Sequence, residues 1–383
     1  MNLTNFILTF GNKTFKERPF NNVDALVLSQ ISYLNLDLIA PSVNDEKLPP
    51  ICIKDIPAHL VKKLASDELT SRQNAPFLTS LISSIRYKNI GIQYVLNEHD
   101  YVNEKQIFAV TLILPTQKRF IAFRGTDLSL VGWKEDLKMS YKSRVPAQEV
   151  AIEYLNKVTS RFKEHYYIGG HSKGGNLAFY TALNQNKKQI DRTIKVYSFD
   201  GQGFYSNVLF NNKHFDRIKE KLIKIVPKYC VVGIMLNDIK NIKVVDANSV
   251  GILQHNPHSW IIDPNTGDFK YIKSRSKQSY VNELAVNNWI QSLNKEETIL
   301  IVDVIFDYLG ELHLTLYSLI ENLPRTIANF FRVHRQFSDI QKKKISSIYK
   351  RLFYYYKKAR LFYNSKEGKK YLLDQLKENK KDA

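Results

Sequence analysis

Apolar and polar residues follow different spacings in successive parts of the chain. Residues 22–34 have the three- and four-residue spacing of a helix face, with Asp24 where an acidic residue favours a helix N-terminus. Two segments rich in β-branched and aromatic residues, 107–114 and 118–123, flank a short turn and predict a strand pair. Helical and extended patterns then alternate. The expected elements are helices at 147–164 and 174–184 and strands at 166–169, 193–199, 222–226 and 242–245.

This order of elements predicts an α/β fold with a central, mostly parallel sheet, because helices that alternate with strands form the crossovers between parallel strands. Residues 251–268 contain several Gly and Pro residues and two histidines, which predicts a loop. From residue 298 the pattern is helical to the end. We therefore expect an α/β domain over residues 1–296 and a helical segment over residues 297–383.

Composition narrows the class of protein. The 383 residues are 44% hydrophobic and 24% charged, which is typical of a globular protein and excludes a disordered or collagen-like chain. The two cysteines, Cys52 and Cys230, are too few for a disulfide framework and predict reduced thiols. No stretch has the length and apolarity of a membrane-spanning helix, and the first residues lack the pattern of a signal peptide. These features predict a cytoplasmic protein, with a membrane-peripheral location and leaderless export as alternatives.

The net charge of +19 is concentrated near the C-terminus. From residue 325 onward there are 17 Lys and Arg against 5 Asp and Glu, which accounts for +12 of the total. The expected helix has one apolar face, and three roles suit it: a packing helix with solvated lysines, a helix that docks on an anionic membrane, or a contact to nucleic-acid phosphates. The third is the least favoured. The apolar face consists of Ile345, Ile348, Leu352, Tyr355, Ala359 and Phe362.

A G-x-S-x-G motif, Gly170-His171-Ser172-Lys173-Gly174, lies between an expected strand and an expected helix. In this context the serine occupies a tight turn that exposes its hydroxyl, so Ser172 is the candidate nucleophile. The backbone N–H of Lys173, at the helix start, would face an oxyanion formed there. The alternative is a glycine-rich turn that contains a serine by chance.

The stretch FIAFRGT at 120–126, followed by WKEDL at 133–137 and the serine motif, resembles the α/β-hydrolase superfamily, particularly the class 3 lipases. An uncharacterised bacterial lipase-like family of the same clan is more similar still, because that resemblance extends to residues 22–34, 198–204 and 254–260. The resemblance implies an α/β-hydrolase fold and a serine esterase or lipase. Its substrate would be a carboxylic ester, particularly an acyl lipid.

The resemblance also implies an oxyanion hole. The residue after Arg-Gly would be Thr126, and we prefer it to Asp127 because a carboxylate would repel the oxyanion. Thr126 could equally be a strand-end turn residue. We expect Arg124 and Asp136 to form a structural ion pair. The Lys173 side chain either adds a positive charge near the site, which would favour anionic or polar substrates, or points to solvent.

A serine nucleophile needs a base and an acid that orients it, in the chain order Ser, acid, His. The preferred base is His255, which lies a few residues before a tryptophan as in class 3 lipases, and His258 is the alternative. The preferred acid is Asp200, whose place after a strand resembles that in pancreatic-type lipases. Asp238 and Asp246 are alternatives.

Class 3 lipases have the acid at the position that Lys224 occupies here. This departure motivates an alternative function, a catalytically silent binding module on a hydrolase scaffold whose basic tail docks to membrane. No residues have the spacing of a metal site or a phosphate-binding loop, so we expect neither a metal nor a cofactor.

Overall fold

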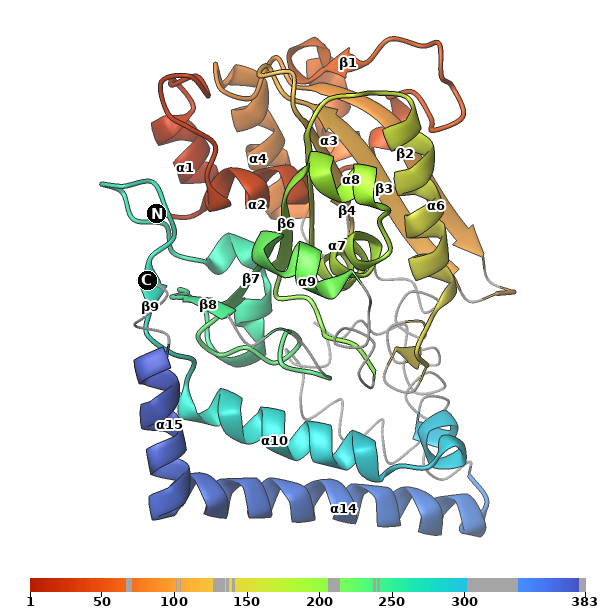
Figure 1. The fold of residues 1–383 in the computed structure, drawn as a ribbon, viewed down its shortest axis with the longest axis vertical. Coiled ribbons are helices and arrows are strands. Elements are labelled where there is room, and N and C mark those ends of the chain that lie inside the picture. Colours follow the sequence, from red (N-terminus) through yellow and green to blue (C-terminus); the bar gives the residue numbers. More distant parts are fainter. Residues whose placement is uncertain are drawn as a thin grey trace.

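A nine-stranded sheet organises the part of the chain that the structure describes (Figure 1). The structure is a computed structural model that describes residues 1–66, 71–100, 102–103, 105–126, 135, 138–139, 142–205, 214–236, 239, 242–301 and 337–378. The strands lie side by side in chain order. They are β1 (Ile51–Cys52), β2 (Gly91–Asp100), β3 (Lys105–Ile113), β4 (Arg119–Phe123), β5 (Tyr166–His171), β6 (Thr193–Phe199), β7 (Leu222–Pro227), β8 (Ile242–Val245) and β9 (Tyr271–Ile272).

The sheet combines parallel and antiparallel pairing. Strands β4 to β8 are parallel to one another, whereas β1 to β4 pair in antiparallel fashion, as do β8 and β9. Among the described strands, parallel and antiparallel pairings are therefore equally frequent. The predicted mixed α/β class is confirmed, but a mostly parallel sheet is not. The difference arises because β1 and β2 extend the predicted β3–β4 pair in antiparallel fashion and β9 pairs antiparallel with β8, and the sequence pattern revealed none of these three strands.

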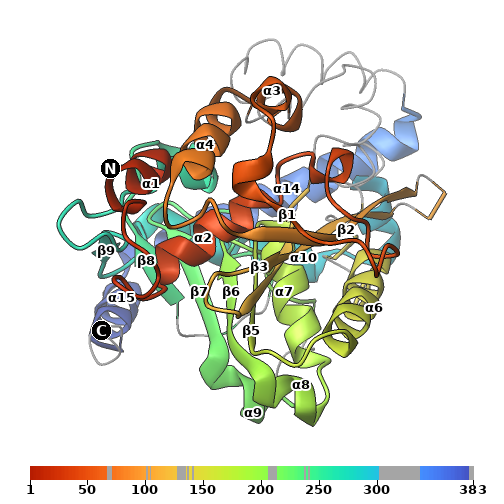
Figure 2. The same cartoon turned by 90° about the horizontal axis from the view of Figure 1, so that it is seen from above.

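Helices cover both faces of the sheet (Figures 1 and 2). Successive residues of a strand point to opposite faces, and in β3 Phe108 and Val110 belong to one core while Ile107 and Ala109 belong to the other. Helices α1, α2 and α4 pack in the first core, and α6 and α7 in the second. The helices are α1 (Leu3–Phe10), α2 (Asn22–Ile31), α3 (Val61–Leu64), α4 (Ser71–Ser83), α6 (Pro146–Ser160), α7 (Lys173–Leu183), α8 (Lys187–Arg192), α9 (Phe215–Ile218), α10 (Lys277–Ser292), α14 (Asp339–Asn364) and α15 (Lys366–Glu378).

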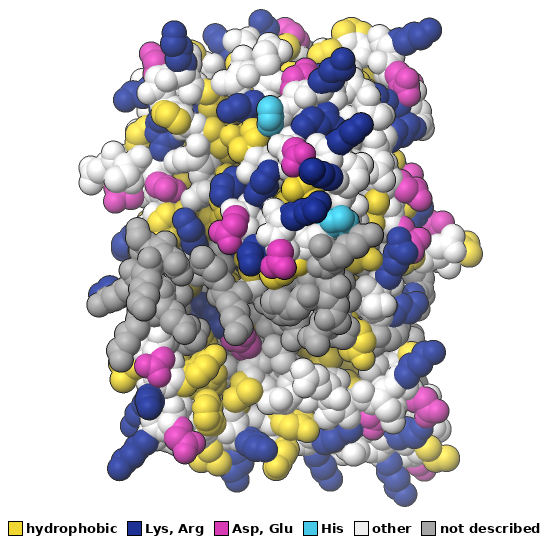
Figure 3. All heavy atoms as spheres, viewed as in Figure 1, with side chains coloured by type: hydrophobic (Ala, Val, Ile, Leu, Met, Phe, Trp, Pro, Cys, Tyr) yellow, Lys and Arg dark blue, Asp and Glu magenta, His cyan; other side chains and the backbone are white. Residues whose placement is uncertain are grey.

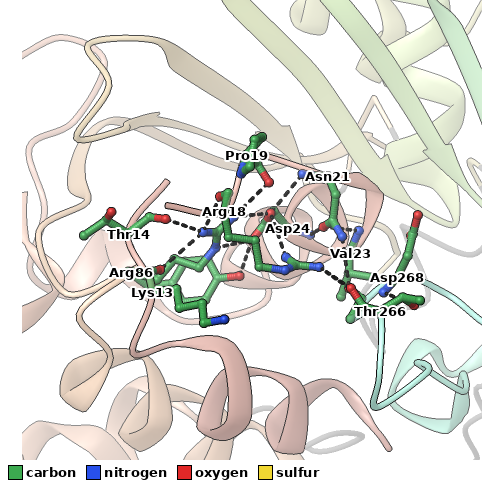
Figure 4. A network of polar contacts seen from close by, with 12 residues as sticks. Lys13, Thr14, Arg18, Pro19, Asn21, Val23, Asp24, Arg86, Thr266 and Asp268 are labelled. Atoms are coloured by element: carbon green, nitrogen blue, oxygen red, sulfur yellow. Dashed lines mark hydrogen bonds and ion pairs between the residues drawn. The ribbon is translucent and has the colours of Figure 1, made fainter. Parts of the chain in front are cut away.

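A buried ion pair holds the N-terminal helices together (Figure 4). Asp24 is part of the capping box that begins α2, as its position predicted, and its carboxylate also binds the Arg86 guanidinium at 2.7 and 2.6 Å. Arg86 donates further hydrogen bonds to backbone carbonyls between residues 13 and 19. Both side chains are fully buried, so the pair fixes the N-terminal segment against the residues that follow α4.

The last described helices form a separate layer at one end of the molecule (Figure 1). Helix α14 packs along α10, and their small apolar cluster includes Tyr280, Val281, Ala359 and Tyr363. The predicted C-terminal helices are confirmed for residues 339–378. The division between residues 296 and 297 stays a prediction. No described helix has the length and apolarity needed to cross a lipid bilayer.

Candidate active site

Ser172 lies on a sharp turn between β5 and α7. Its backbone angles, φ 58° and ψ −131°, are unusual for a residue with a side chain and place the serine between strand and helix. Its N–H donates to the Phe199 carbonyl at 2.9 Å, which ties the turn to the end of β6. The strand, turn and helix that the motif predicted are therefore present.

Close backbone packing explains the glycines around the serine. A Cβ atom on Gly170 would lie 2.3 Å from the Gly174 backbone, and one on Gly174 would lie 2.1 Å from the Phe123 carbonyl oxygen. A Cβ on Gly125 would lie 3.0 Å from the Ser172 Cβ. The end of β4 and its Arg-Gly-Thr sequence thus approach the serine directly, because no side chain intervenes.

His255 bridges Ser172 and Asp200. Its Nε2 atom lies 3.0 Å from Ser172 Oγ, and its Nδ1 atom lies 2.6 Å from Asp200 Oδ2. An ionised carboxylate only accepts hydrogen bonds, so Nδ1 carries the proton and Nε2 has a lone pair for the serine hydroxyl. This is the geometry in which an imidazole removes a proton from a serine. The structure brings together the preferred nucleophile, base and acid from three separate segments.

Asp200 is buried and held by several donors. Its Oδ1 atom accepts hydrogen bonds from the Cys230 thiol at 2.8 Å and the Gly233 N–H at 3.2 Å. Burial alone would raise the pKa of Asp200, but the hydrogen bond and charge of His255, together with the Cys230 thiol, lower it below its usual value. Burial also raises the pKa of the Cys230 thiol, so Cys230 stays a donor. Nothing local in the sequence marks Cys230 and Gly233 as partners of Asp200, so their role could not be predicted from it.

The segment that carries His255 is anchored on both sides. The buried Trp260 side chain donates to the Gln254 carbonyl at 2.8 Å, and the Gln254 side chain accepts from the Tyr229 N–H at 2.7 Å. Gln254 and Trp260, which flank His255 in the sequence, are thus parts of one support. They hold the His255 backbone in place beside the serine.

His171 supports the His255 backbone from the other direction. Its Nε2 atom lies 2.8 Å from the His255 carbonyl oxygen, so Nε2 must carry the proton. Its Nδ1 atom therefore accepts from the Tyr33 hydroxyl at 2.9 Å, and that hydroxyl accepts from the Gly125 N–H at 3.1 Å. Burial and the neighbouring His255 lower the pKa of His171 to about 3, which keeps the ring neutral. Tyr33, which no motif in the sequence marks, thus links the residue after β4 to the histidine segment.

The two residues whose N–H groups the sequence predicts for an oxyanion hole, Lys173 and Thr126, each lie one residue from a position at the serine turn. Lys173 is the first residue of α7, where an N–H has no partner within the helix. Thr126 follows Gly125, which packs against Ser172. These positions agree with the predicted oxyanion hole, whose role stays a prediction. Asp127, Trp133 and Asp136 lie outside the described residues, so the Arg124–Asp136 pair is not tested; the Arg124 guanidinium lies 3.9 Å from the centre of the Phe108 ring.

The Lys173 side chain neither lines the site nor points to solvent, and both expectations for it are wrong. Its ammonium group is fully buried and contacts Glu135 at 2.6 Å and the Gln106 carbonyl at 2.7 Å. Glu135 also accepts from the N–H groups of Gln106 and Ala147. The charge is therefore neutralised within the core, where it cannot select anionic substrates.

His258, the alternative base, and Asp246, an alternative acid, have partners other than Ser172 and His255. His258 is buried with its ring in T-shaped contact with Phe77, and burial lowers its pKa to about 4. Asp246 forms an ion pair with Lys270 at 3.0 Å. Asp238 lies outside the described residues. Across the part of the chain that the structure describes, no group of three or more His, Cys, Asp or Glu side chains could hold a metal ion.

Comparisons with known proteins give one match. No curated protein and no solved structure matches the chain. The model of the Mbeg1-like family, a lipase-like family, matches residues 81–307, which is more than half of the chain and includes Ser172, Asp200 and His255. The chain therefore belongs to the Mbeg1-like family.

Proposed function

We propose that this protein is an α/β-hydrolase that cleaves carboxylic esters with Ser172 as nucleophile, and that its substrates are acyl lipids. The observation that carries the proposal is the continuous hydrogen-bonded series from Ser172 through His255 to Asp200. The lipase-like family supports the ester class of substrate.

In the proposed reaction the Ser172 hydroxyl oxygen attacks the ester carbonyl carbon while His255 Nε2 takes the hydroxyl proton. Asp200 holds the imidazole in the required tautomer and stabilises its positive charge. The N–H groups of Lys173 and Thr126 would stabilise the oxyanion. The ester C–O bond then breaks, His255 returns the proton to the departing alcohol, and water releases the acid by the same steps.

A lysine at the acid position of class 3 lipases does not argue against this mechanism, because Asp200 supplies the carboxylate from the end of β6. The reaction requires no metal or cofactor. The binding-module alternative then loses the observation that motivated it, and it becomes one outcome of the test.

The test is labelling of the purified protein with a fluorescent fluorophosphonate, which reacts only with an activated serine. We expect the wild type to be labelled, Ser172→Ala to be unlabelled, and His255→Ala to be labelled at least 1000-fold more slowly. Asp246→Asn is the matched control for Asp200→Asn, because Asp246 is also an ion-paired aspartate but lies away from the serine. Unlabelled, folded wild-type protein would refute the proposal and favour a binding module.

Hydrolysis of p-nitrophenyl esters of increasing acyl length, followed by phospholipid and acylglycerol substrates, then tests the substrate class. Activity confined to short soluble esters would contradict the acyl-lipid part of the proposal while leaving the serine mechanism intact.

A further inference from the structure

Helix α14 presents two different faces. Its inner face packs on α10 through the apolar cluster and through polar contacts, including Trp289 Nε1 to the Ile348 carbonyl at 3.1 Å and Arg351 to the Ser292 carbonyl at 2.9 Å. Lys350, Tyr354, Lys357 and Leu361 follow the four-three-four spacing of one helix face, and all four are exposed. The polar anchors fix the rotation of the helix, so this outer face is preformed.

The outer face is both cationic and apolar. Phe353 is 76% exposed, Tyr354 59% and Leu361 61%, although such side chains favour burial. Cations surround them. The only acidic residue of α14 is Asp339, which lies in the first turn of the helix and is more than three turns away from Phe353. Figure 3 shows Lys and Arg side chains along the edge of the molecule that α14 forms, with hydrophobic side chains among them. The surrounding cations are Lys350, Lys357, Lys358 and Arg360.

The acidic residues just after α10 pair with other cations of α14. Glu297 binds Arg351 and Glu296 binds Lys344, both at the junction with α10. Within the described part of the chain, no ion pair is formed by Lys350, Lys357, Lys358 or Arg360. Among the described residues, the outer face therefore keeps its positive charge.

We propose that the outer face of α14, defined by Lys350, Phe353, Tyr354, Lys357, Lys358, Arg360 and Leu361, docks on an anionic lipid membrane. A bilayer surface matches both properties of this face, because its phosphates attract the cations while the headgroup boundary buries the aromatic and aliphatic side chains. The helix has 26 residues and is about 39 Å long, so it can lie flat on the surface. A nucleic acid would match only the charge, since its phosphates offer no site for Leu361 or Phe353.

Docking is independent of the proposed hydrolase activity, but the fold connects the two regions. Helix α10 lies between α14 and the segment after β7, and its Ser279 hydroxyl donates to the Cys230 carbonyl at 2.7 Å. Asn287 of α10 also accepts from the Leu236 N–H at 2.8 Å. The same segment supplies Cys230 and Gly233 as hydrogen-bond donors to Asp200. Only α10 therefore lies between α14 and the segment that holds the candidate acid.

The test is co-sedimentation of the full-length protein with vesicles of phosphatidylcholine and phosphatidylglycerol, compared with vesicles of phosphatidylcholine alone. We expect binding only to the anionic vesicles, weakened by added salt. Each cation near the surface strengthens binding about fivefold, so replacing Lys350, Lys357, Lys358 and Arg360 with Gln should weaken it roughly 100-fold or more. Because insertion is also expected, Phe353→Ser with Leu361→Ser should weaken binding by about tenfold or more.

A matched control removes the same charge elsewhere. Lys47, Lys118, Lys187 and Lys188 are also exposed, and replacing them with Gln should leave vesicle binding almost unchanged. Equal binding of the two vesicle types, no binding, or unchanged binding by the α14 charge variant would each overturn the proposal. The double variant Phe353→Ser with Leu361→Ser separates a membrane surface from a nucleic-acid surface. If this variant still binds random duplex DNA tightly and still binds the vesicles, the result would favour a nucleic-acid surface instead. Fluorophosphonate labelling without vesicles should be the same in all variants.

Discussion

The buried Lys173–Glu135 ion pair can be tested by substituting each partner alone and both together. Lys173 is also the residue that follows the candidate nucleophile, so the same variants report on the site. Lys173→Met removes the ammonium group and leaves the Glu135 carboxylate buried, with the N–H groups of Gln106 and Ala147 as its remaining donors among the described residues. Glu135→Gln leaves the ammonium group buried without its counter-charge. Neither substitution changes the backbone N–H of Lys173.

The expected magnitude follows from the complete burial of both side chains. Removing one partner of a buried ion pair typically costs about 3–5 kcal/mol, since an uncompensated charge stays in the core. The double variant Lys173→Met with Glu135→Gln buries no charge, so it should be more stable than either single variant. A coupling free energy of about 2–4 kcal/mol is expected between the two positions.

Urea unfolding followed by circular dichroism measures the free energy of unfolding of the four proteins. Single-variant losses below about 1 kcal/mol, or losses that simply add in the double variant, would refute a buried, charged pair. Because the ammonium group does not line the site, Lys173→Met should not change the preference between anionic and neutral esters. A changed preference would restore the expectation that Lys173 faces the substrate.

Three further predictions concern the surroundings of the serine and the histidines. Tyr33→Phe removes the hydroxyl between Gly125 and His171, and should lower the labelling rate about tenfold with the fold retained on circular dichroism; an unchanged rate would contradict a positioning role. Cys230→Ala removes one donor to Asp200 and should slow labelling several-fold, whereas Cys230→Ser keeps the donor and should react nearly as the wild type does; equal effects of the two would contradict the hydrogen bond. Burial lowers the pKa of His258 from 6.5 to about 4, so between these values the unfolded chain binds a proton that the folded protein does not, and the free energy of unfolding falls as the pH falls. Between pH 7 and pH 4.5 the free energy of unfolding of His258→Phe, measured in urea titrations, should therefore fall by about 2 kcal/mol less than that of the wild type. The same fall in both proteins would contradict the burial of this histidine.

Local sequence patterns were sufficient to predict the strand and helix around the candidate nucleophile. The predicted strand and helix on either side of Ser172 correspond to β5 and α7, because glycine spacing and apolar periodicity depend on near neighbours in the chain. The apolar face of the C-terminal helix was predicted for the same reason, with Ile345, Ile348 and Ala359 buried. By contrast, β2 was missed, because it follows a segment of mixed pattern and its tip is polar.

The sequence by itself determined the candidate nucleophile, the mixed α/β class and the basic amphipathic C-terminal helix. The tertiary structure decided which histidine lies beside Ser172 and which aspartate lies beside that histidine. In the sequence His255 is 83 residues and Asp200 28 residues away from Ser172, and only the sheet brings their loops together. It also decided that Lys173 faces Glu135 in the core and that Cys230 supports Asp200. A side chain's direction and its distant partners depend on strand register and packing, which no local pattern records.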